Sequence, residues 1–225
     1  MGSRSSVFKS DLSPSPLHFS GMVKRGAFIV FEGIDGSGKS THIRLLCDAL
    51  RQQGYDVLRT SEPSRGRIGR FIRDYVEHRR NRLSPEIEAL LFAADRFEHV
   101  KQMITPALEA GRIVISDRYL HSSLAYQGAA GVSLEWIREM NRFAPRPDLC
   151  ILLDVRPETG LGRMSRRRRT VFEVYTFQQR VRNLYLRFVE QGELVKVDAD
   201  RPVEEVQQEV SGLVRNLLAG ASESP

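Results

Sequence analysis

The chain has 225 residues and a mass of 25.6 kDa, which suits one domain with a sizeable apolar core. No apolar run in the sequence approaches the length of a membrane span. The net charge is +6, but much of the excess lies in RMSRRRR at 163–169, and no nucleic-acid reading motif accompanies it. We therefore expect a cytoplasmic protein that binds neither membranes nor nucleic acid.

The two ends of the chain differ from the rest in composition. Residues 1–25 are rich in Ser and Pro and show no helical or strand period, which is typical of a disordered extension. We expect a single domain over 26–219 and a short C-terminal tail over 220–225. Cys47 and Cys150 show neither metal-ligand nor disulfide spacing, which fits buried thiols in a reducing compartment.

The apolar stretch FIVF at 28–31 predicts a buried strand, because four consecutive β-forming residues suit the interior of a parallel sheet. The turn after it carries the pattern Gly-x4-Gly-Lys-Ser, and apolar residues at helical spacing follow. Strand, glycine-rich loop and helix in this order predict a phosphate-binding loop for a nucleoside triphosphate and its Mg²⁺. The expected ATP-binding residues are Gly33, Ile34, Asp35, Gly36, Ser37, Gly38, Lys39, Ser40 and Thr41.

Further strands and helices alternate along the remaining chain. The strands are expected at 56–60, 112–117, 149–155 and 193–199, and the helices at 67–79, 85–110, 133–143, 157–164, 173–190 and 202–218. This alternation is typical of an α/β protein with three layers, in which a five-stranded parallel sheet carries helices on both faces. Ligands of such sheets bind beyond the carboxyl ends of the strands.

Polar residues follow several of these predicted strands. Asp35 and Glu62 come after the first and second strands, and Asp117 and Arg118 end the third. A carboxylate that ends an apolar strand is typical of a site for nucleotide-bound Mg²⁺, so we expect Ser40 and Asp117 to hold the metal. A helix cap is the alternative for Asp117. The guanidinium beside it, a phosphate-binding fork, favours the functional interpretation.

A second substrate is indicated by the many polar and aromatic residues in the middle of the chain. Arg73, Arg96 and Arg118 are candidates to surround an acceptor phosphate. Phe92 and Tyr126 are candidates to face a base and a sugar. Taken alone, Phe92 fits the apolar stripe of a helix, the arginines fit a solvated surface and Tyr126 fits loop packing.

Several motifs together resemble those of one family. FEGIDGSGKST, EPSRGRIGRFIR, LLFAADRFEHV and ISDRYLHSSLAYQGA are similar to successive motifs of thymidylate kinases, and PDLCILLDVRPE continues the match to about residue 200. The resemblance implies a P-loop kinase fold and transfer of the γ-phosphoryl group of ATP to dTMP, with Mg²⁺. It also implies a homodimer, with the long helix at 85–110 as an interface element.

The resemblance implies roles at the phosphate end of the acceptor. Asp35 would lie near the acceptor phosphate and the 3′-hydroxyl, and Glu62 would lie beside the acceptor and the metal. Arg73 and Arg118 would bind the acceptor phosphate. Lys39, Asp35 and Arg118 are therefore the expected catalytic residues of the sheet edge.

The resemblance also implies roles at the base end. Phe92 would stack on thymine, and Arg96 would donate a hydrogen bond to the base. Ser123 and Gln127 would frame the base pocket. Tyr126 would lie against the deoxyribose, where it would disfavour a 2′-hydroxyl.

The arginine run suggests a short lid at about 163–172. Phosphoryl transfer spreads negative charge over the equatorial oxygens, and a cationic cover stabilises that charge. Some thymidylate kinases carry the cation in the phosphate loop and others in the lid; the loop position here is Gly36. We therefore expect the catalytic cation among Arg166, Arg167, Arg168 and Arg169, with a solvated basic face as the alternative.

The chain departs from the family pattern at Ser61, where the relatives often carry arginine before Glu-Pro. Arg59 or Arg65 would have to substitute for that side chain. Two other functions stay open at this point. One is a kinase for another monophosphate, such as dUMP, CMP or AMP. The other is a P-loop protein that binds a nucleotide and a partner without phosphoryl transfer.

Overall fold

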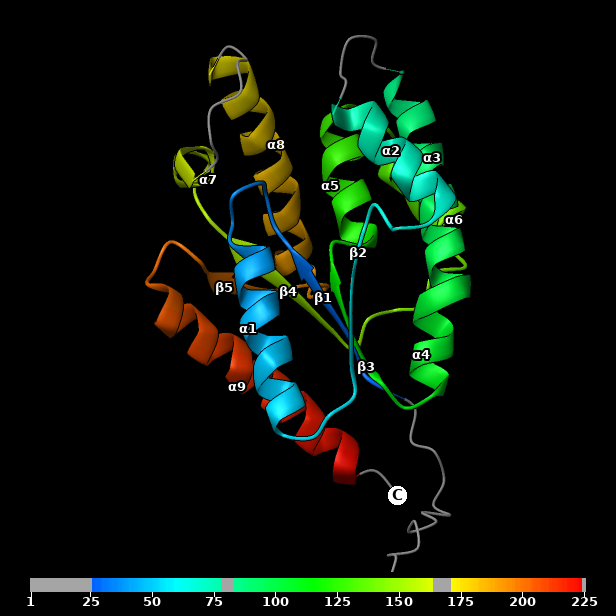
Figure 1. Ribbon diagram of the computed structural model, residues 1–225. Helices are drawn as coiled ribbons and strands as arrows, with labels where there is room; N and C mark the ends of the chain where they lie inside the picture. The colour runs from blue at the N-terminus through cyan, green and yellow to red at the C-terminus, as the bar shows by residue number, and fades with distance from the viewer. Residues whose placement is uncertain (1–25, 78–82, 164–170, 224–225) are drawn as a thin grey trace, which may run out of the picture.

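A five-stranded parallel sheet forms the middle layer, in the strand order β2-β3-β1-β4-β5 (Figure 1). The computed structural model describes residues 26–77, 83–163 and 171–223. The strands are β1 Phe28–Glu32, β2 Val57–Ser61, β3 Ile113–Asp117, β4 Leu149–Asp154 and β5 Val195–Asp198. The predicted α/β class and the five parallel strands are confirmed.

The central strand β1 explains why its sequence is continuously apolar. It pairs with β3 on one side and β4 on the other, so that Val30 lies opposite Ser116 and Cys150. Every residue of β1 is buried, because neighbouring strands cover its edges and helices cover both faces. The strand ends in Glu32, a fully buried carboxylate at the carboxyl edge of the sheet.

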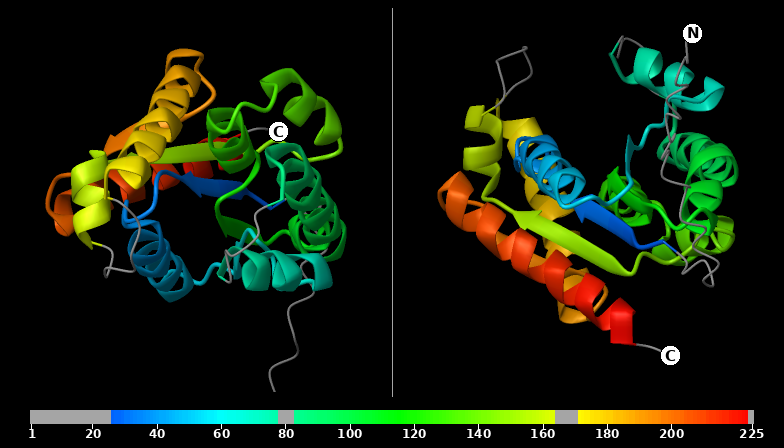
Figure 2. Two further views of the ribbon diagram at one scale, coloured as in Figure 1. Left: turned by 90° about the horizontal axis from the view of Figure 1, so that it is seen from above. Right: turned by 60° about the horizontal axis from the view of Figure 1, so that its bottom comes forward.

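The helices cover both faces of the sheet. Among the described residues, α1 and α9 contact each other on one face, whereas α4 and α8 pack on the other face, with α5 against α8. Seen from above, β1 and β4 run between α1 and α8 (Figure 2). The helices are α1 Lys39–Gln52, α2 Arg67–Glu77, α3 Pro85–His99, α4 Thr105–Glu109, α5 Leu120–Ala129, α6 Leu134–Met140, α7 Pro157–Arg163, α8 Val171–Glu190 and α9 Val203–Glu223.

Helix α5 was not among the predicted elements. Its sequence, LHSSLAYQGA, carries no clear apolar stripe, because polar residues such as His121, Ser123 and Gln127 are buried together with Leu124. A helix that is buried on two sides, polar residues included, loses the alternation on which a sequence prediction depends. The absence of the period therefore reflects the position of α5 between α3 and α8, with Ser123 directed at Arg96 and His121 at Glu193.

The helix predicted over 85–110 is interrupted in its middle. The π-helix η1 Val100–Ile104 separates α3 from α4, and the N–H of Thr105 donates to the carbonyl oxygen of Val100. Pro106 follows at the start of α4 and has no N–H for the regular helical bond. The wider turn accommodates the proline and lets the helical segment continue along the sheet.

The described residues bear on the expected absence of a membrane span and on the state of the two cysteines. None of the helices in these ranges is long and apolar enough to cross a membrane. Cys47 and Cys150 are both free and buried, as predicted. The predicted extension over 1–25 lies outside the described residues, and the domain boundaries stay predictions.

Candidate functional site

The loop between β1 and α1 has the backbone of a phosphate cradle. Gly33, Gly36 and Gly38 have φ angles of 143°, 77° and 90°, which favour glycine. A Cβ at Gly36 would lie 2.1 Å from the carbonyl oxygen of Gly160 in α7, so no side chain fits at that position. Because α1 begins at Lys39, the positive end of its dipole lies at this loop.

Lys39 lies inside the loop, with only 7% of its surface exposed. Its Nζ donates to the carbonyl oxygens of Gly33 and Ile34, both at 3.0 Å, and to Ser37 Oγ at 3.2 Å. Burial, and then repulsion from Arg118, lowers the pKa of Lys39 to about 8, although nearby carboxylates oppose the shift. The ammonium is thus held by neutral oxygens, for which phosphate oxygens would be stronger replacements.

Ser40 and Asp117, the residues predicted to hold Mg²⁺, lie together. Ser40 Oγ donates to Asp117 Oδ2 at 2.9 Å. Over the described ranges there is no group of three or more His, Cys, Asp or Glu side chains that could hold a metal. Mg²⁺ in kinases binds through one or two carboxylates together with substrate phosphates. A hydroxyl and a carboxylate at this edge therefore fit an ion that arrives with its nucleotide.

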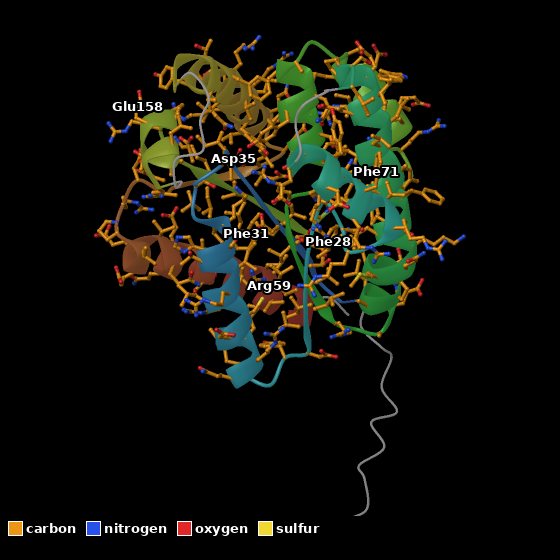
Figure 3. All side chains as sticks on the ribbon, turned by 45° about the horizontal axis from the view of Figure 1, so that its top comes forward. Phe28, Phe31, Asp35, Arg59, Phe71 and Glu158 are labelled. Carbon is orange, nitrogen blue, oxygen red and sulfur yellow. The ribbon has the colours of Figure 1, made fainter. Side chains whose placement is uncertain are left out.

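Asp35, Arg118 and Tyr126 form a hydrogen-bonded cluster beside the loop. Arg118 Nη2 donates to Asp35 Oδ1 at 2.7 Å, and the Tyr126 hydroxyl donates to the same oxygen at 3.2 Å. Partial burial would raise the pKa of the Asp35 carboxyl, but the cations of Arg118 and Lys39 hold it below its usual value. Asp35 is therefore anionic at neutral pH. In Figure 3 it lies between Glu158 of α7 and Phe71 of α2.

The backbone fixes the position of Arg118. Its φ of 74° makes it the one non-glycine residue with positive φ in the described part of the chain. Such backbone is strained for a residue with a Cβ and is typical of binding sites. The Arg118 N–H donates to the carbonyl oxygen of Phe31 at 2.9 Å, and Ser116 Oγ donates to the Arg118 carbonyl at 2.8 Å. These bonds hold the turn against β1 and β3.

Glu62 and Arg96 form a buried ion pair where β2 ends. Their exposed fractions are 5% and 1%. Nε and Nη2 of Arg96 donate to Glu62 Oε2 at 2.9 Å and 2.7 Å, and His99 Nδ1 lies 3.2 Å from Glu62 Oε1. Arg96 Nη2 also donates to Ser123 Oγ at 3.0 Å. The pair thus ties the end of β2 to α3 and α5.

The other predicted acceptor residues lie on the same elements. Phe92 is half-buried one turn before Arg96, and it is not part of the apolar core cluster. Gln127 is buried in α5, one turn after Ser123. Arg73 of α2 donates to two carbonyl oxygens of the loop that follows Glu62. The structure therefore gathers the predicted base residues on α3 and α5, with Arg73 at the neighbouring loop.

Two buried residues of these clusters, Glu32 and Gln178, were not predicted from the sequence. Glu32 accepts hydrogen bonds from the N–H groups of Tyr119 and Ser122 at 2.9 Å and 3.1 Å. Gln178 Nε2 of α8 donates to Asp35 Oδ2 at 3.2 Å. Glu32 carried a signal, because it ends an apolar strand as Asp117 does. Gln178 carried none, since it lies 143 residues from its partner.

The predicted lid can be described only at its two ends. Arg166, Arg167, Arg168 and Arg169 lie outside the described residues. Beside them, Arg163 Nη2 of α7 donates to the carbonyl oxygen of Ala199 at 3.2 Å. Tyr175 Oη of α8 donates to Glu158 Oε1 of α7 at 2.9 Å, so a hydrogen bond joins the two helices that flank the lid.

The fold and these clusters define a P-loop nucleotide-binding protein of the α/β class. The family model described as thymidylate kinase matches residues 31–210. A probable thymidylate kinase of Pyrococcus abyssi (strain GE5 / Orsay) is 49% identical over 203 residues, which cover 87% of this chain and 99% of the relative. The chain belongs to the thymidylate kinase family.

Other relatives give the same result. A probable thymidylate kinase of Pyrococcus horikoshii is 45% identical over 203 residues, with 87% of this chain and 99% of the relative covered. One of Pyrobaculum aerophilum is 46% identical over 194 residues, with 85% and 98% covered. The predicted family is therefore confirmed over almost the full length of these relatives.

Proposed function

We propose that this chain transfers the γ-phosphoryl group of ATP to dTMP, which gives dTDP and ADP and supplies dTTP synthesis. The observation that carries the proposal is the presence of two adjoining sites at one sheet edge. The phosphate loop holds Lys39, and the turn that carries Arg118 joins it to the buried cluster around Arg96. A protein that only binds or hydrolyses one nucleotide needs no such second cluster.

On the donor side, Lys39 and the loop N–H groups hold the phosphates of ATP. Ser40 and Asp117 would hold Mg²⁺, which neutralises charge on the β- and γ-phosphates when it is bound. Lys39 exchanges its carbonyl partners for phosphate oxygens and stabilises the charge that develops during transfer. The loop therefore both binds the donor and contributes to catalysis.

At the phosphate end of the acceptor, Arg118 and Arg73 bind the phosphate of dTMP. Asp35 accepts a hydrogen bond from the 3′-hydroxyl. Its lowered pKa keeps the carboxylate ionised at neutral pH, so that both oxygens can accept. The acceptor phosphate is already anionic, so its oxygen attacks in line without a general base. Catalysis is then mostly positioning and electrostatic stabilisation.

At the base end, thymine stacks on Phe92 and accepts a hydrogen bond from Arg96. Ser123 and Gln127 frame the base pocket, while Glu62 holds the guanidinium of Arg96. Tyr126 is fixed by Asp35 and Arg118. It packs against the deoxyribose, where it disfavours a 2′-hydroxyl.

A cationic lid completes the proposed mechanism. The backbone of Gly160 meets Gly36 so closely that an arginine at that loop position is excluded. In this proposal Arg166, Arg167, Arg168 or Arg169 supplies, together with Lys39, the positive charge that stabilises the transferred phosphoryl group. Closure also keeps water away from the γ-phosphate.

The proposed function is tested by the choice of acceptor. ADP production is measured with ATP and Mg²⁺ and with dTMP, dUMP, the ribonucleotide TMP, CMP or AMP as acceptor. We expect a strong preference for dTMP over its ribonucleotide, because in the proposed complex Tyr126 packs against the deoxyribose. If none of the acceptors increases ADP production, the proposed kinase function is wrong. Faster turnover of CMP or AMP than of dTMP would show that the chain phosphorylates a different nucleoside monophosphate.

The depressed pKa of Lys39 predicts a pH dependence. The ammonium form binds phosphate and is lost as pH rises through a pKa of about 8 in the free enzyme. We therefore expect kcat/KM for ATP to fall above that pH, whereas kcat falls only at higher pH, because bound phosphates raise the pKa. Lys39→Arg, which stays protonated, should lack this decline even if it is slow. A wild-type profile that stays flat from about pH 7 to about pH 9.5 would contradict the prediction.

We further propose that the chain works in the cytoplasm as a homodimer. Ile87, Leu90 and Phe97 of α3 are about half exposed, an unusual state for large apolar side chains on one helix. The free thiols of Cys47 and Cys150 fit a reducing compartment. These features support the proposal, with α3 as the interface helix.

A further inference from the structure

The guanidinium of Arg96 has nearly all its hydrogen-bond donors engaged by protein. A guanidinium carries five N–H groups. Nε and Nη2 donate to Glu62 Oε2, and Nη2 also reaches the carbonyl oxygen of Tyr119 and Ser123 Oγ, both at 3.0 Å. Nη1 donates to Asn141 Oδ1 at 2.6 Å. Among partners in the described ranges, one Nη1–H has no acceptor.

The side chain of Asn141 is held in place beside Nη1 of Arg96. The residue follows α6 as its C-cap and is only 2% exposed. Its Nδ2 donates to the carbonyl oxygen of Ile137 at 2.8 Å, which fixes the orientation of the amide. The oxygen therefore faces Arg96 and accepts one of the two Nη1 hydrogens.

Glu62 alone does not fix the orientation of Arg96. Both bonds from Arg96 end on the same carboxylate oxygen, Oε2. Two donors on one acceptor atom leave a pivot about that atom. The Tyr119 carbonyl and Ser123 further restrain Nη2, whereas Asn141 binds the opposite nitrogen, Nη1, and fixes that corner of the guanidinium.

We propose that Asn141 is a positioning residue that turns the remaining Nη1–H of Arg96 toward the acceptor base, an inference that rests on the proposed function. Arginine only donates hydrogen bonds, so this group recognises only an acceptor atom. Thymine carries an oxygen at position 4, where cytosine carries an amino group that donates. Asn141 thereby sets the preference for a pyrimidine with an oxygen at position 4.

The test compares acceptors in the full chain carrying Asn141→Leu. We expect KM for dTMP to rise about tenfold, while kcat and KM for ATP change less than about twofold. The ratio of kcat/KM for dTMP to that for dCMP should fall about tenfold, because only dTMP loses a hydrogen bond. The ratio of dTMP to dUMP should not change, because both bases carry the oxygen. A purely structural defect would move none of these ratios.

Matched variants separate orientation from helix stability. Asn141→Asp keeps the oxygen that accepts from Nη1 and should keep the dTMP preference. Ser133→Ala removes the side-chain cap of α6, an acceptor of the Trp136 N–H, and should lower stability without changing acceptor ratios. Asn141→Ala answers the same question if the leucine variant does not fold.

An unchanged dTMP to dCMP ratio in Asn141→Leu or Asn141→Ala would overturn the inference. So would an equal loss of that ratio in Ser133→Ala. Failure of the proposed function would be visible beforehand, as wild-type protein that makes no ADP from ATP and dTMP.

Discussion

Replacement of Lys39 by methionine is expected to lower kcat by about 10²- to 10³-fold, the loss typical for one preorganised donor to a developing negative charge. Methionine has a similar length and fills the buried space that Lys39 occupies at 7% exposure. The substitution therefore removes a charge and three hydrogen bonds without opening a cavity. Steady-state kinetics with saturating ATP and dTMP measure the effect.

The thermal stability of the same variant separates catalysis from folding. A buried ammonium whose pKa is depressed by burial is destabilising while no phosphate is bound. We therefore expect the melting temperature of ligand-free Lys39→Met to equal or exceed that of the wild type, while stabilisation by ATP is largely lost.

A remote lysine provides the control for this prediction. Lys101 is exposed on η1, so Lys101→Met should leave kcat, KM for ATP and stability unchanged. A Lys39→Met enzyme that kept a kcat within about tenfold of the wild type would rule out the proposed mechanism. A folded variant with normal binding of ATP would contradict the donor-side role.

The sequence predicts the strands that are apolar along their whole length and the helices that have one apolar face. β1 and β4 lie between other strands and read as continuous apolar runs, and α1 and α9 each bury one face. Helix α5 could not be predicted this way, because it buries polar side chains on more than one side, with Ser123 at Arg96 and His121 at Glu193. The local period fails at the element that carries the predicted acceptor residues Ser123, Tyr126 and Gln127.

In the candidate site, too, the sequence predicts the part that a local pattern specifies and misses the part that tertiary packing brings together. The phosphate loop is local, so glycines, lysine and hydroxyl within one turn already specify an anion cradle. Asn141 and Gln178 reach the site only through tertiary packing, from 45 and 143 residues away from Arg96 and Asp35. No pattern within a single element distinguishes a buried amide that orients an arginine from one that simply ends a helix.

Replacement of Glu62 by leucine is expected to lower the free energy of unfolding by about 3–5 kcal/mol, because it leaves the buried cation of Arg96 without its partner. Arg96 is 1% exposed, so solvent cannot replace the carboxylate. His99, which lies 3.2 Å from Glu62 Oε1, loses a partner as well. Denaturant unfolding of the ligand-free protein measures the change.

A double-mutant cycle with Arg96→Met tests whether the pair, and not either side chain, causes the loss. When both charges are replaced by apolar groups of similar size, no uncompensated ion is left, so the double variant should be more stable than Glu62→Leu alone. The exposed pair Asp56–Arg112 has a comparable N–O distance of 2.9 Å, with 68% and 33% of the two side chains exposed. Asp56→Asn should therefore lower stability by at most about 1 kcal/mol. Equal losses at the two pairs, or a double variant no more stable than Glu62→Leu, would show that burial of the Arg96 charge does not govern the stability of this site.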